Sequence, residues 1–339
     1  MVSDFLTQPR GPIILAMMSR LSRFLVVGVV TAFAVWCALS LRADFAQMSF
    51  LPLWRSWNLA LLAMTLTFFN YALRIARWRW YLKRLGHRVP GGFAALTYVA
   101  GFAFTLSPGK LGELVRARYY TAIGVPARDV MAAFWAERLM DLVALLLLAL
   151  LALREFPRYQ ALVWASGGVV ALGAVVLLLF PSERIAHFFK SSPRLPKLIA
   201  HGAARAVTSF GVARSLLSPR PILVGLLVAL AAWGLEGLGL GVLGSIFSPV
   251  HNDAPTAVGI YAVAVLVGAV SFLPGGVGGT ETVMTALLVS EGASLVPALL
   301  TTLACRITTL WLGVCLGWLA VALLRYGPQY ERSAWPSEP

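Results

Sequence analysis

Residues 107–113 read SPGKLGE, and residues 274–281 read PGGVGGTE. Each segment interrupts a long apolar run with a Pro-Gly pair, which breaks a helix that would otherwise continue. In each segment a glutamate is followed 25 residues later by an arginine. The two pairs are Glu113 with Arg138 and Glu281 with Arg306. Charged residues at membrane depth are costly unless they are paired or functional, so the repeated pattern predicts a duplicated transport site.

The composition assigns the chain to the membrane proteins. Apolar residues make up 59% of it, charged residues 12%, and the mean hydropathy is +0.80. These values exclude a soluble domain and predict an all-α polytopic membrane protein, with residues 1–339 forming a single integral membrane domain. The first apolar run is too long for a secretory signal and has no convincing cleavage site, so we expect it to be retained. Apolar runs predict about six transmembrane helices, near 24–41, 53–73, 129–153, 160–180, 221–247 and 295–324.

The net charge of +14 is unevenly distributed, and its distribution predicts the topology. Ten Lys/Arg residues lie between 74 and 128, seven between 181 and 220, and none between Arg220 and Arg306. The two basic regions, Arg74 and Arg77 included, are therefore expected as cytoplasmic loops. The amino terminus and the loops with Lys83 and Lys197 are expected in the cytoplasm, whereas Asp253 and Gly278 face outside. Trp78 and Trp80 are interpreted as an interfacial aromatic belt, and no nucleic-acid partner is expected.

Two further apolar stretches, 92–107 and 255–273, run directly into the Pro-Gly breaks. If 92–107 crossed the bilayer, the basic residues that follow it would lie outside, against the charge distribution. Both regions are therefore predicted to be re-entrant helical hairpins that enter from opposite faces, with their tips in the bundle interior. The residues of the hairpin breaks are Pro108, Gly109, Pro274, Gly275, Gly276, Gly278 and Gly279.

A repeat unit follows from these features: a span, a broken hairpin, and a span that carries the arginine. Unit one covers about 53–153 and unit two about 221–324. Three crossings separate the starts of the two units, and an odd number gives an inverted repeat. The linker 181–220 alternates apolar with basic residues and is interpreted as a cytoplasmic amphipathic segment at the surface of anionic lipid.

Three motifs resemble a known family. They are SPGKLGE at 107–113 with Arg116, ERLMD at 137–141, and PGGVGGTE at 274–281 followed by Arg306. Together they resemble the flippase-like transmembrane region of lysylphosphatidylglycerol synthases over almost the whole chain. The resemblance implies a membrane protein that moves lipids between leaflets or assists an envelope-lipid pathway, in the bacterial inner membrane. Full-length synthases add a soluble aminoacyl-transferase domain, and this chain ends at Pro339, so lysine transfer is not expected. Lys110 stands where many relatives have arginine, and the substrate does not carry over.

The predicted site binds a lipid headgroup. A broken hairpin exposes backbone N–H groups and the positive end of a half-helix, which suits a phosphate or carboxylate. Arg138 and Arg306 would hold the phosphate, and the two glutamates would hold the arginines when lipid is absent or would carry a proton. Alternatively, Arg138 and Asp141 form a static ion pair, and Arg116 is an interfacial anchor. Glu236 is intramembrane without a partner that sequence can name. The candidate headgroup-binding residues are Glu113, Arg116, Arg138, Asp141, Glu281 and Arg306.

Three functions are compatible with these features. We favour a flippase or scramblase of an anionic or isoprenoid envelope lipid. A membrane enzyme is less supported, because no His-Glu-x-x-His or Gly-x-Ser-x-Gly motif occurs. The third alternative is a non-catalytic partner of a lipid-modifying enzyme, in which the motifs only stabilise the fold. No metal or cofactor is expected, because Cys37, Cys305 and Cys315 lie in apolar runs without metal-ligand spacing.

Overall fold

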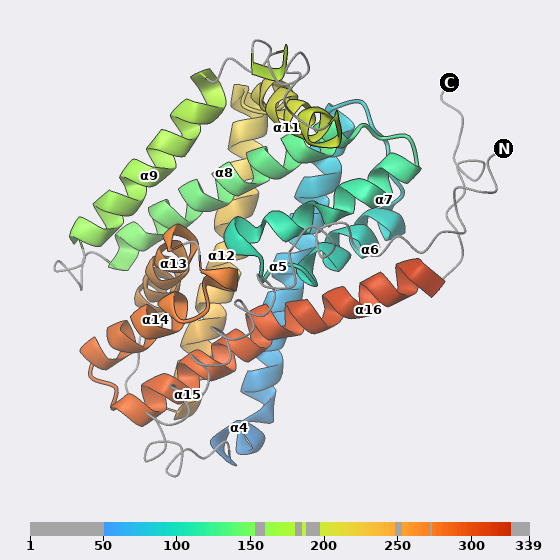
Figure 1. The fold of residues 1–339 in the computed structure, drawn as a ribbon. Helices are drawn as coiled ribbons and strands as arrows, with labels where there is room; N and C mark the ends of the chain where they lie inside the picture. Colours follow the sequence, from blue (N-terminus) through green and yellow to red (C-terminus); the bar gives the residue numbers. More distant parts are fainter. Residues whose placement is uncertain are drawn as a thin grey trace, which may run out of the picture. The chain divides into compact units, whose positions relative to one another are not determined.

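The computed structural model describes residues 51–152, 160–179, 185–187, 197–247, 253–271 and 273–326, all within one unit of the chain, Phe50–Pro339. The expected first span, 24–41, and the amino terminus lie outside the described residues. The described residues form helices and turns and contain no strand, so the predicted all-α class is confirmed (Figure 1).

The helices follow one another in the order of Figure 1, with short helical turns between some of them. They are α4 (Leu51–Arg55), α5 (Trp57–Arg84), α6 (Gly91–Phe102), η2 (Pro108–Val115), α7 (Arg116–Ala122), α8 (Ala127–Ala152), α9 (Gln160–Leu179), α11 (Lys197–Ser215), α12 (Pro219–Phe247), α13 (Ala254–Val270), η4 (Pro274–Gly276), α14 (Gly279–Ser290), α15 (Leu295–Arg306), η5 (Ile307–Trp311) and α16 (Leu312–Tyr326).

Three of the described helical stretches are long and apolar enough to cross a membrane: α5, α12, and the continuous stretch Leu295–Arg325. The expected spans 129–153 and 160–180 coincide with α8 and α9. The middle of α8 carries three charged residues, which lower its hydropathy. Large apolar side chains such as Phe69, Leu172 and Leu319 point outward, as expected of a surface in contact with lipid. The chain is a membrane-embedded helical protein.

One predicted boundary is wrong. The apolar run that begins at residue 53 ends at 73, but α5 continues to Arg84, so Arg74 and Arg77 lie inside a helix rather than in a loop. Both arginines are buried. Trp78 was expected in an interfacial belt but is fully buried, where its indole N–H donates to the Tyr120 hydroxyl at 2.8 Å. Hydropathy misses this part of α5 because its charged groups are neutralised by partners distant in sequence.

Both Pro-Gly breaks have the same backbone. Each proline follows an extended residue and starts a short 3₁₀ turn. The next two residues are left-handed in both breaks, with φ of 60° and 57° at Gly109 and Lys110 and of 62° and 69° at Gly275 and Gly276. Only glycine adopts this region without strain, and Lys110 is the only non-glycine residue with positive φ in the described part of the chain.

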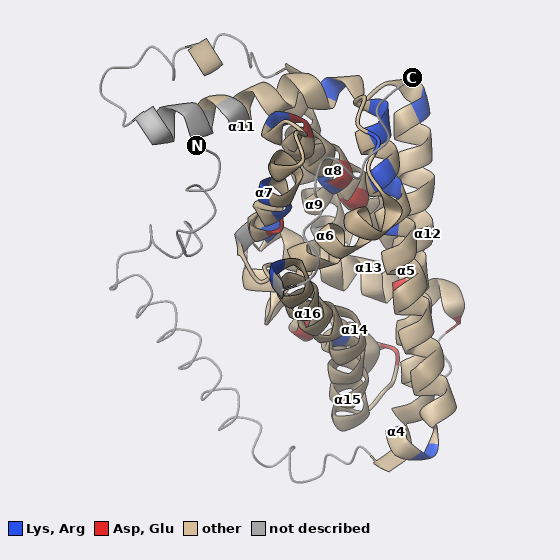
Figure 2. Ribbon diagram, turned by 90° about the vertical axis from the view of Figure 1, so that its right-hand side faces the viewer, with Lys and Arg blue, Asp and Glu red and all other residues tan. Residues whose placement is uncertain are grey.

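The two breaks lie against each other, and the helices that lead into them cross over to the other half of the chain. Contacts join η2 to η4. Helix α6, which precedes the first break, packs mainly on α16, whereas α13, which precedes the second, packs mainly on α8. Helices α5 and α12 form the most extensive helix pair. The basic carboxyl-terminal half of α5 lies beside the start of α12, as the donation from Arg77 to the Gly225 carbonyl at 3.3 Å requires (Figure 2).

The linker helix α11 packs on the protein. Phe210 of α11 stacks against Trp135 of α8 with ring centroids 5.3 Å apart, and the Trp135 indole N–H donates to the Ser209 hydroxyl at 3.0 Å. Val207 lies in a small apolar cluster with Ala186 and Ala204. At least part of the apolar face that was interpreted as lipid-facing therefore covers α8.

Candidate functional site

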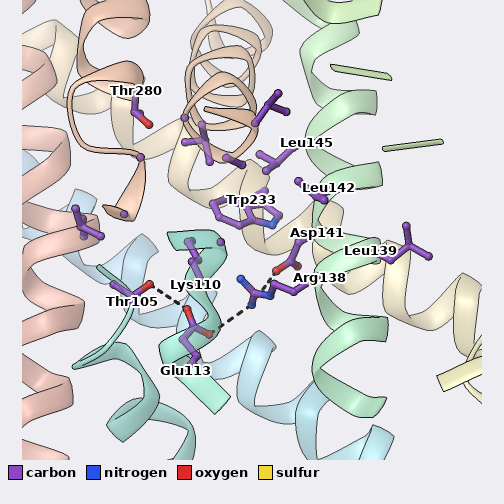
Figure 3. A pocket seen from close by; sticks show the side chains of 18 of the residues that line it. Thr105, Lys110, Glu113, Arg138, Leu139, Asp141, Leu142, Leu145, Trp233 and Thr280 are labelled. Carbon is purple, nitrogen blue, oxygen red and sulfur yellow. Dashed lines mark hydrogen bonds and ion pairs between the residues drawn. The ribbon is translucent and has the colours of Figure 1, made fainter. Parts of the chain in front are cut away.

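A cavity of about 460 Å³ lies where the two breaks meet α5, α8, α12 and α13 (Figure 3). Its lining combines charged and apolar residues. The charged residues come from α5, the first break, α8, α12 and α15, and many of the apolar residues come from α8 and α9. The charged lining residues are Arg74, Lys110, Glu113, Arg138, Asp141, Glu236 and Arg306. The apolar wall includes Leu139, Leu142, Leu145, Val169, Val170, Val176 and Leu177.

Asp141 is a junction between α8 and α5. Its Oδ1 accepts from Arg77 Nη2 at 2.6 Å, and its Oδ2 lies 3.3 Å from Arg74 Nη2 and 3.2 Å from Arg138 Nη2. Spacings of three and four residues bring Arg138, Asp141 and Glu137 to one face of α8. One carboxylate thus serves three arginines, two of which come from the part of α5 that was predicted to be a loop.

Glu137 lies next to Asp141 and is fully buried. Its Oε1 accepts from Arg77 Nη2 at 3.1 Å and from the Tyr98 hydroxyl, and its Oε2 lies 3.6 Å from both Arg116 and Arg138. The carboxylate therefore joins α8 to α5, α6 and α7. Such a group orients its neighbours rather than meeting a ligand, and it does not line the cavity.

Glu113 and Arg116 form a local pair after the first break. Arg116 Nη2 donates to Glu113 Oε2 at 2.7 Å, and the Thr105 hydroxyl donates to Oε1 at 3.0 Å. The Arg116 guanidinium is fully buried, with its Cζ 4.5 Å from the centre of the Trp78 ring and 4.4 Å from that of Tyr98. Arg138 Nη2 lies farther from Glu113, at 3.7 Å. The expected Glu113–Arg138 pair is therefore the weaker of the two that Glu113 makes.

The second break is closed by its own glutamate and arginine. Arg306 Nε donates to Glu281 Oε1 at 2.7 Å, and its Nη2 donates to the Gly275 carbonyl at 3.0 Å. The other carboxylate oxygen of Glu281 accepts from the Gly278 backbone N–H at 2.6 Å. Arg306 thereby ties α15 to both sides of the turn, through contacts 25 and 31 residues apart in sequence.

Among the cations that line the cavity in the described chain, Lys110 is the one without an ion-pair partner. Its Nζ lies 5.6 Å from the centre of the Trp233 ring, a cation–π contact, and Arg74 Cζ lies 5.2 Å from the same ring. The buried Trp233 Nε1–H and Arg138 Nε–H find no hydrogen-bond acceptor among the described residues. Donors thus outnumber acceptors here.

The charges around the first break do not cancel. Five cations and three carboxylates form one group, and Glu236 across the same cavity adds a fourth carboxylate when it is charged, so at least one positive charge is in excess. The cations are Arg74, Arg77, Lys110, Arg116 and Arg138, and the carboxylates are Glu113, Glu137 and Asp141. A buried excess of positive charge is stable only with an anion or water nearby, so the arrangement suits an anionic ligand.

Glu236 of α12 occupies the α13 side of the cavity. Its Oε1 accepts from the Asn70 side-chain amide of α5, and its Oε2 accepts from the Tyr261 hydroxyl of α13. Sequence reasoning placed Glu236 in the membrane without a partner, and both partners come from other helices. The separations of 166 and 25 residues explain why no local pattern indicated them.

The structure brings most of the predicted residues to one cavity. Glu113, Arg138, Asp141 and Arg306 line it, as do Gly109, Gly275 and Gly276 of the breaks. Arg116 and Glu281 do not line it but hold residues that do. Sequence reasoning missed Arg74, Arg77, Lys110 and Trp233 as parts of the site. A signal existed for α5, since Asn70, Arg74 and Arg77 are spaced as one face of a helix.

Neither a metal site nor a disulfide is found in the described chain. No group of three or more His, Cys, Asp or Glu residues there is arranged to hold a metal. Cys305 is buried and Cys315 is exposed, both as free thiols, and Cys37 lies outside the described residues.

Residues 21–317 match the family described as the lysylphosphatidylglycerol synthase TM region. No curated protein matches the chain. The family's name connects it with a membrane lipid.

Proposed function

The chain belongs to the family of lysylphosphatidylglycerol synthase TM regions, and we propose that it moves lipid between membrane leaflets as a flippase- or scramblase-like transporter. The substrate class is an anionic or isoprenoid envelope lipid. The membrane is the bacterial inner membrane, with the amino terminus in the cytoplasm. One observation carries the proposal: a single cavity joins an uncompensated positive charge to an apolar wall.

The charged side of the cavity suits a phosphate. Lys110, Arg138 and Trp233 present N–H groups that lack acceptors or ion-pair partners in the described chain. Arg74 lies on the same side, close enough to Trp233 for a cation–π contact. A phosphate oxygen forms charge-assisted hydrogen bonds with such donors, and these are about twice as strong as neutral ones. An anion bound here would offset the excess positive charge.

The apolar side suits an acyl or isoprenoid chain. Leucines and valines of α8 and α9 line the same cavity as the charged groups. Several neighbouring side chains, among them Leu172 and Leu179, are exposed at the surface of α9. A lipid could therefore keep its chains in hydrocarbon while its headgroup lies at the breaks, which avoids the cost of carrying a charge through lipid alone.

Helix packing supports an inverted repeat of two re-entrant hairpins. The first helices of the two units, α5 and α12, pack on each other, and each hairpin packs on the arginine-bearing span of the other unit. The two breaks share their left-handed backbone and meet each other. A two-fold relation between units predicts this exchange, and access from alternate sides then needs only small movements of the hairpins about the shared site.

A scaffold role is the second candidate, and one observation favours it. Asp141, Glu137 and Arg116 are so fully enclosed by partners that their removal would disturb the fold whatever the function. We do not propose an enzymatic role. A variant that changes the charge of the cavity without disturbing these enclosed groups separates transport from scaffolding.

Lys110→Gly is that variant. Glycine relieves the left-handed strain at this position, which stabilises the fold by about 1–2 kcal/mol. It also gives the unfolded chain more conformational freedom, which destabilises the fold by about 0.5–1 kcal/mol. Stability should therefore stay within about 1 kcal/mol of wild type, while one cavity cation is lost. In proteoliposomes with fluorescent phosphatidylglycerol, a membrane-impermeant quencher added outside would measure movement between leaflets. We expect a decrease of roughly tenfold or more, the size of losing one charged hydrogen bond.

Lys110→Arg is the matched control and should retain most of the movement, because it keeps the charge. Unchanged lipid movement in Lys110→Gly would remove the role of the cavity charge. Wild-type protein that moves no lipid above protein-free vesicles would refute the transport proposal and favour the scaffold.

A further inference from the structure

Glu236 is the exception among the buried carboxylates of the described chain. Glu113, Glu137 and Asp141 each lie within 3.3 Å of an arginine nitrogen. Asp129 lies 3.3 Å from Arg128 and 2.8 Å from His87. Glu236 is only 5% exposed, yet it has no ion pair in the described chain. An arginine holds a carboxylate in its charged form, and Glu236 lacks this constraint.

The partners of Glu236 can satisfy either of its protonation states. The Asn70 amide and the Tyr261 hydroxyl both donate to the carboxylate. Unlike arginine, an amide and a hydroxyl also accept hydrogen bonds. The Asn70 Oδ1 has no partner among the described residues and is available as an acceptor for a protonated carboxyl after rotation of the amide. Buried polar groups must be satisfied in every state they adopt, and this site meets that condition with and without a proton.

The position of Glu236 links its charge to the headgroup site. It lines the same cavity as Lys110, Arg74 and Arg306. The titratable or charged groups that face it are Tyr71 and Arg74 from α5, Lys110 from the first break, Tyr261 from α13, and Cys305 and Arg306 from α15. Protonation of Glu236 would raise the positive charge of the cavity by one. An anionic headgroup and a proton should therefore each favour the binding of the other.

Glu236 also connects to the element that carries the second break. Tyr261 lies on α13, which leads directly to Pro274. The neighbouring Gly237 lets α12 and α13 approach closely, since a Cβ there would lie 2.6 Å from Val258 Cα. A change in the hydrogen bond between Glu236 and Tyr261 would alter the packing of α12 on α13, because packed interfaces switch between arrangements rather than deform.

We infer that Glu236 is a proton-binding site that couples proton binding to occupancy of the headgroup cavity. The effect of the proton on transport rests on the proposed function, whereas the existence of the proton site does not. A proton and an anionic headgroup bind together, and a pH difference across the membrane then biases lipid movement. The chemistry is reversible protonation of a carboxylate, so no bond other than O–H forms or breaks.

Infrared difference spectroscopy tests the proton site without any transport. Protein in nanodiscs of phosphatidylglycerol and phosphatidylcholine would be titrated, and the C=O stretch of a protonated carboxyl followed. We expect a band that titrates in wild type and is lost in Glu236→Gln, which keeps the shape of the side chain. Tyr261→Phe removes one donor and should keep the band but shift its midpoint. Identical titrations in wild type and Glu236→Gln would overturn the inference.

Proteoliposomes test the coupling. With fluorescent phosphatidylglycerol, acidifying one side should change the wild-type rate of movement by roughly fivefold or more, the lower range of coupling between linked sites. Glu236→Gln should still move lipid but lose the dependence on pH. A wild-type rate that does not respond to pH, or a mutant that responds as wild type does, overturns the coupling. If no protein moves lipid, the proposed function fails, and the infrared titration alone decides on the proton site.

Discussion

The two Pro-Gly breaks share a backbone but differ in how their charges are held. At the second break, Arg306 binds Glu281 at 2.7 Å and the Gly275 carbonyl at 3.0 Å, so the turn is closed upon itself. At the first break, Glu113 binds the nearby Arg116 at 2.7 Å, and Arg138 lies at 3.7 Å. Lys110, where the second break has glycine, has no ion pair in the described chain. We infer that the first break leaves a cation available to a ligand, whereas at the second break the charge of Arg306 both lines the cavity and holds the turn.

The largest effect is expected at Asp141, which holds together the charges around the first break. Asp141→Ala leaves Arg74, Arg77 and Arg138 without their shared carboxylate in a buried site. Breaking a buried ion pair by removing one partner costs about 3–5 kcal/mol. We expect poor recovery of folded protein and a large fall in thermal unfolding temperature, measured in detergent by tryptophan fluorescence and size exclusion. Near-wild-type stability would mean that water or a ligand satisfies the arginines, and the dense network of the first half would lose its structural role.

Glycine substitutions compare the two turns directly. In Gly276→Ala the new Cβ would lie 2.8 Å from the Thr280 hydroxyl and 3.2 Å from Gly268 Cα, in a left-handed backbone. In Gly109→Ala the nearest atom is Leu111 Cγ at 3.9 Å. Both pay about 1–2 kcal/mol of backbone strain, and Gly276→Ala adds about 1–3 kcal/mol of overpacking. The thermal unfolding temperature of Gly276→Ala should be lower than that of Gly109→Ala. The reverse order would refute a more tightly packed second turn.

Arg306→Ala tests whether the closed second break matters for transport as well as for structure. Glu281 would keep the Gly278 N–H, and 24% of its side chain is exposed, so water can replace part of the lost pair. The cost in stability should be about 1–2 kcal/mol, less than for Asp141→Ala. We expect lipid movement in proteoliposomes to be abolished while the protein stays monodisperse. A monodisperse variant that moves lipid normally would exclude a transport role for Arg306, and a variant that unfolds or aggregates would favour the scaffold role. Arg306→Lys is the control that keeps the charge.

Local pattern predicted the parts of this site that are local, and missed those that depend on packing. The break positions and the 25-residue spacing of Glu281 and Arg306 follow from sequence, because a proline and two glycines fix a turn whatever surrounds it. The burial of Arg74 and Arg77 does not follow from sequence. Hydropathy scores each arginine as charged and takes no account of the carboxylates of α8 that neutralise it. The preference of Glu113 for Arg116 over Arg138 depends on the aromatic rings around Arg116, which α5 and α6 supply.

The helices that lead into the two breaks also differ at their first residues, where the smallest effect is expected. Helix α13 begins with Asp253, whose Oδ1 accepts from the Thr256 N–H at 3.0 Å, whereas α6 begins after Pro90 without a side-chain cap. Hydrogen bonds from the Thr256 side chain and backbone lower the pKa of Asp253. A lowered folded-state pKa means that the cap stabilises the helix above the unfolded value of about 3.9, and that this stabilisation is lost as pH falls through the folded pKa.

Asp253→Ala should therefore lower the unfolding temperature slightly at about pH 6, and its difference from wild type should vanish in acid below the folded pKa of Asp253. Asp253→Asn keeps a capping oxygen that does not titrate, so it should stay close to wild type at about pH 6 and lose no further stability from the cap in acid. Hydrogen exchange of the first amides of α13, compared with those of α6, measures the effect locally. If α13 frays no faster than α6 when the cap is removed, α13 is held by its packing on α8 and α12, and the cap contributes nothing to the difference between the two helices.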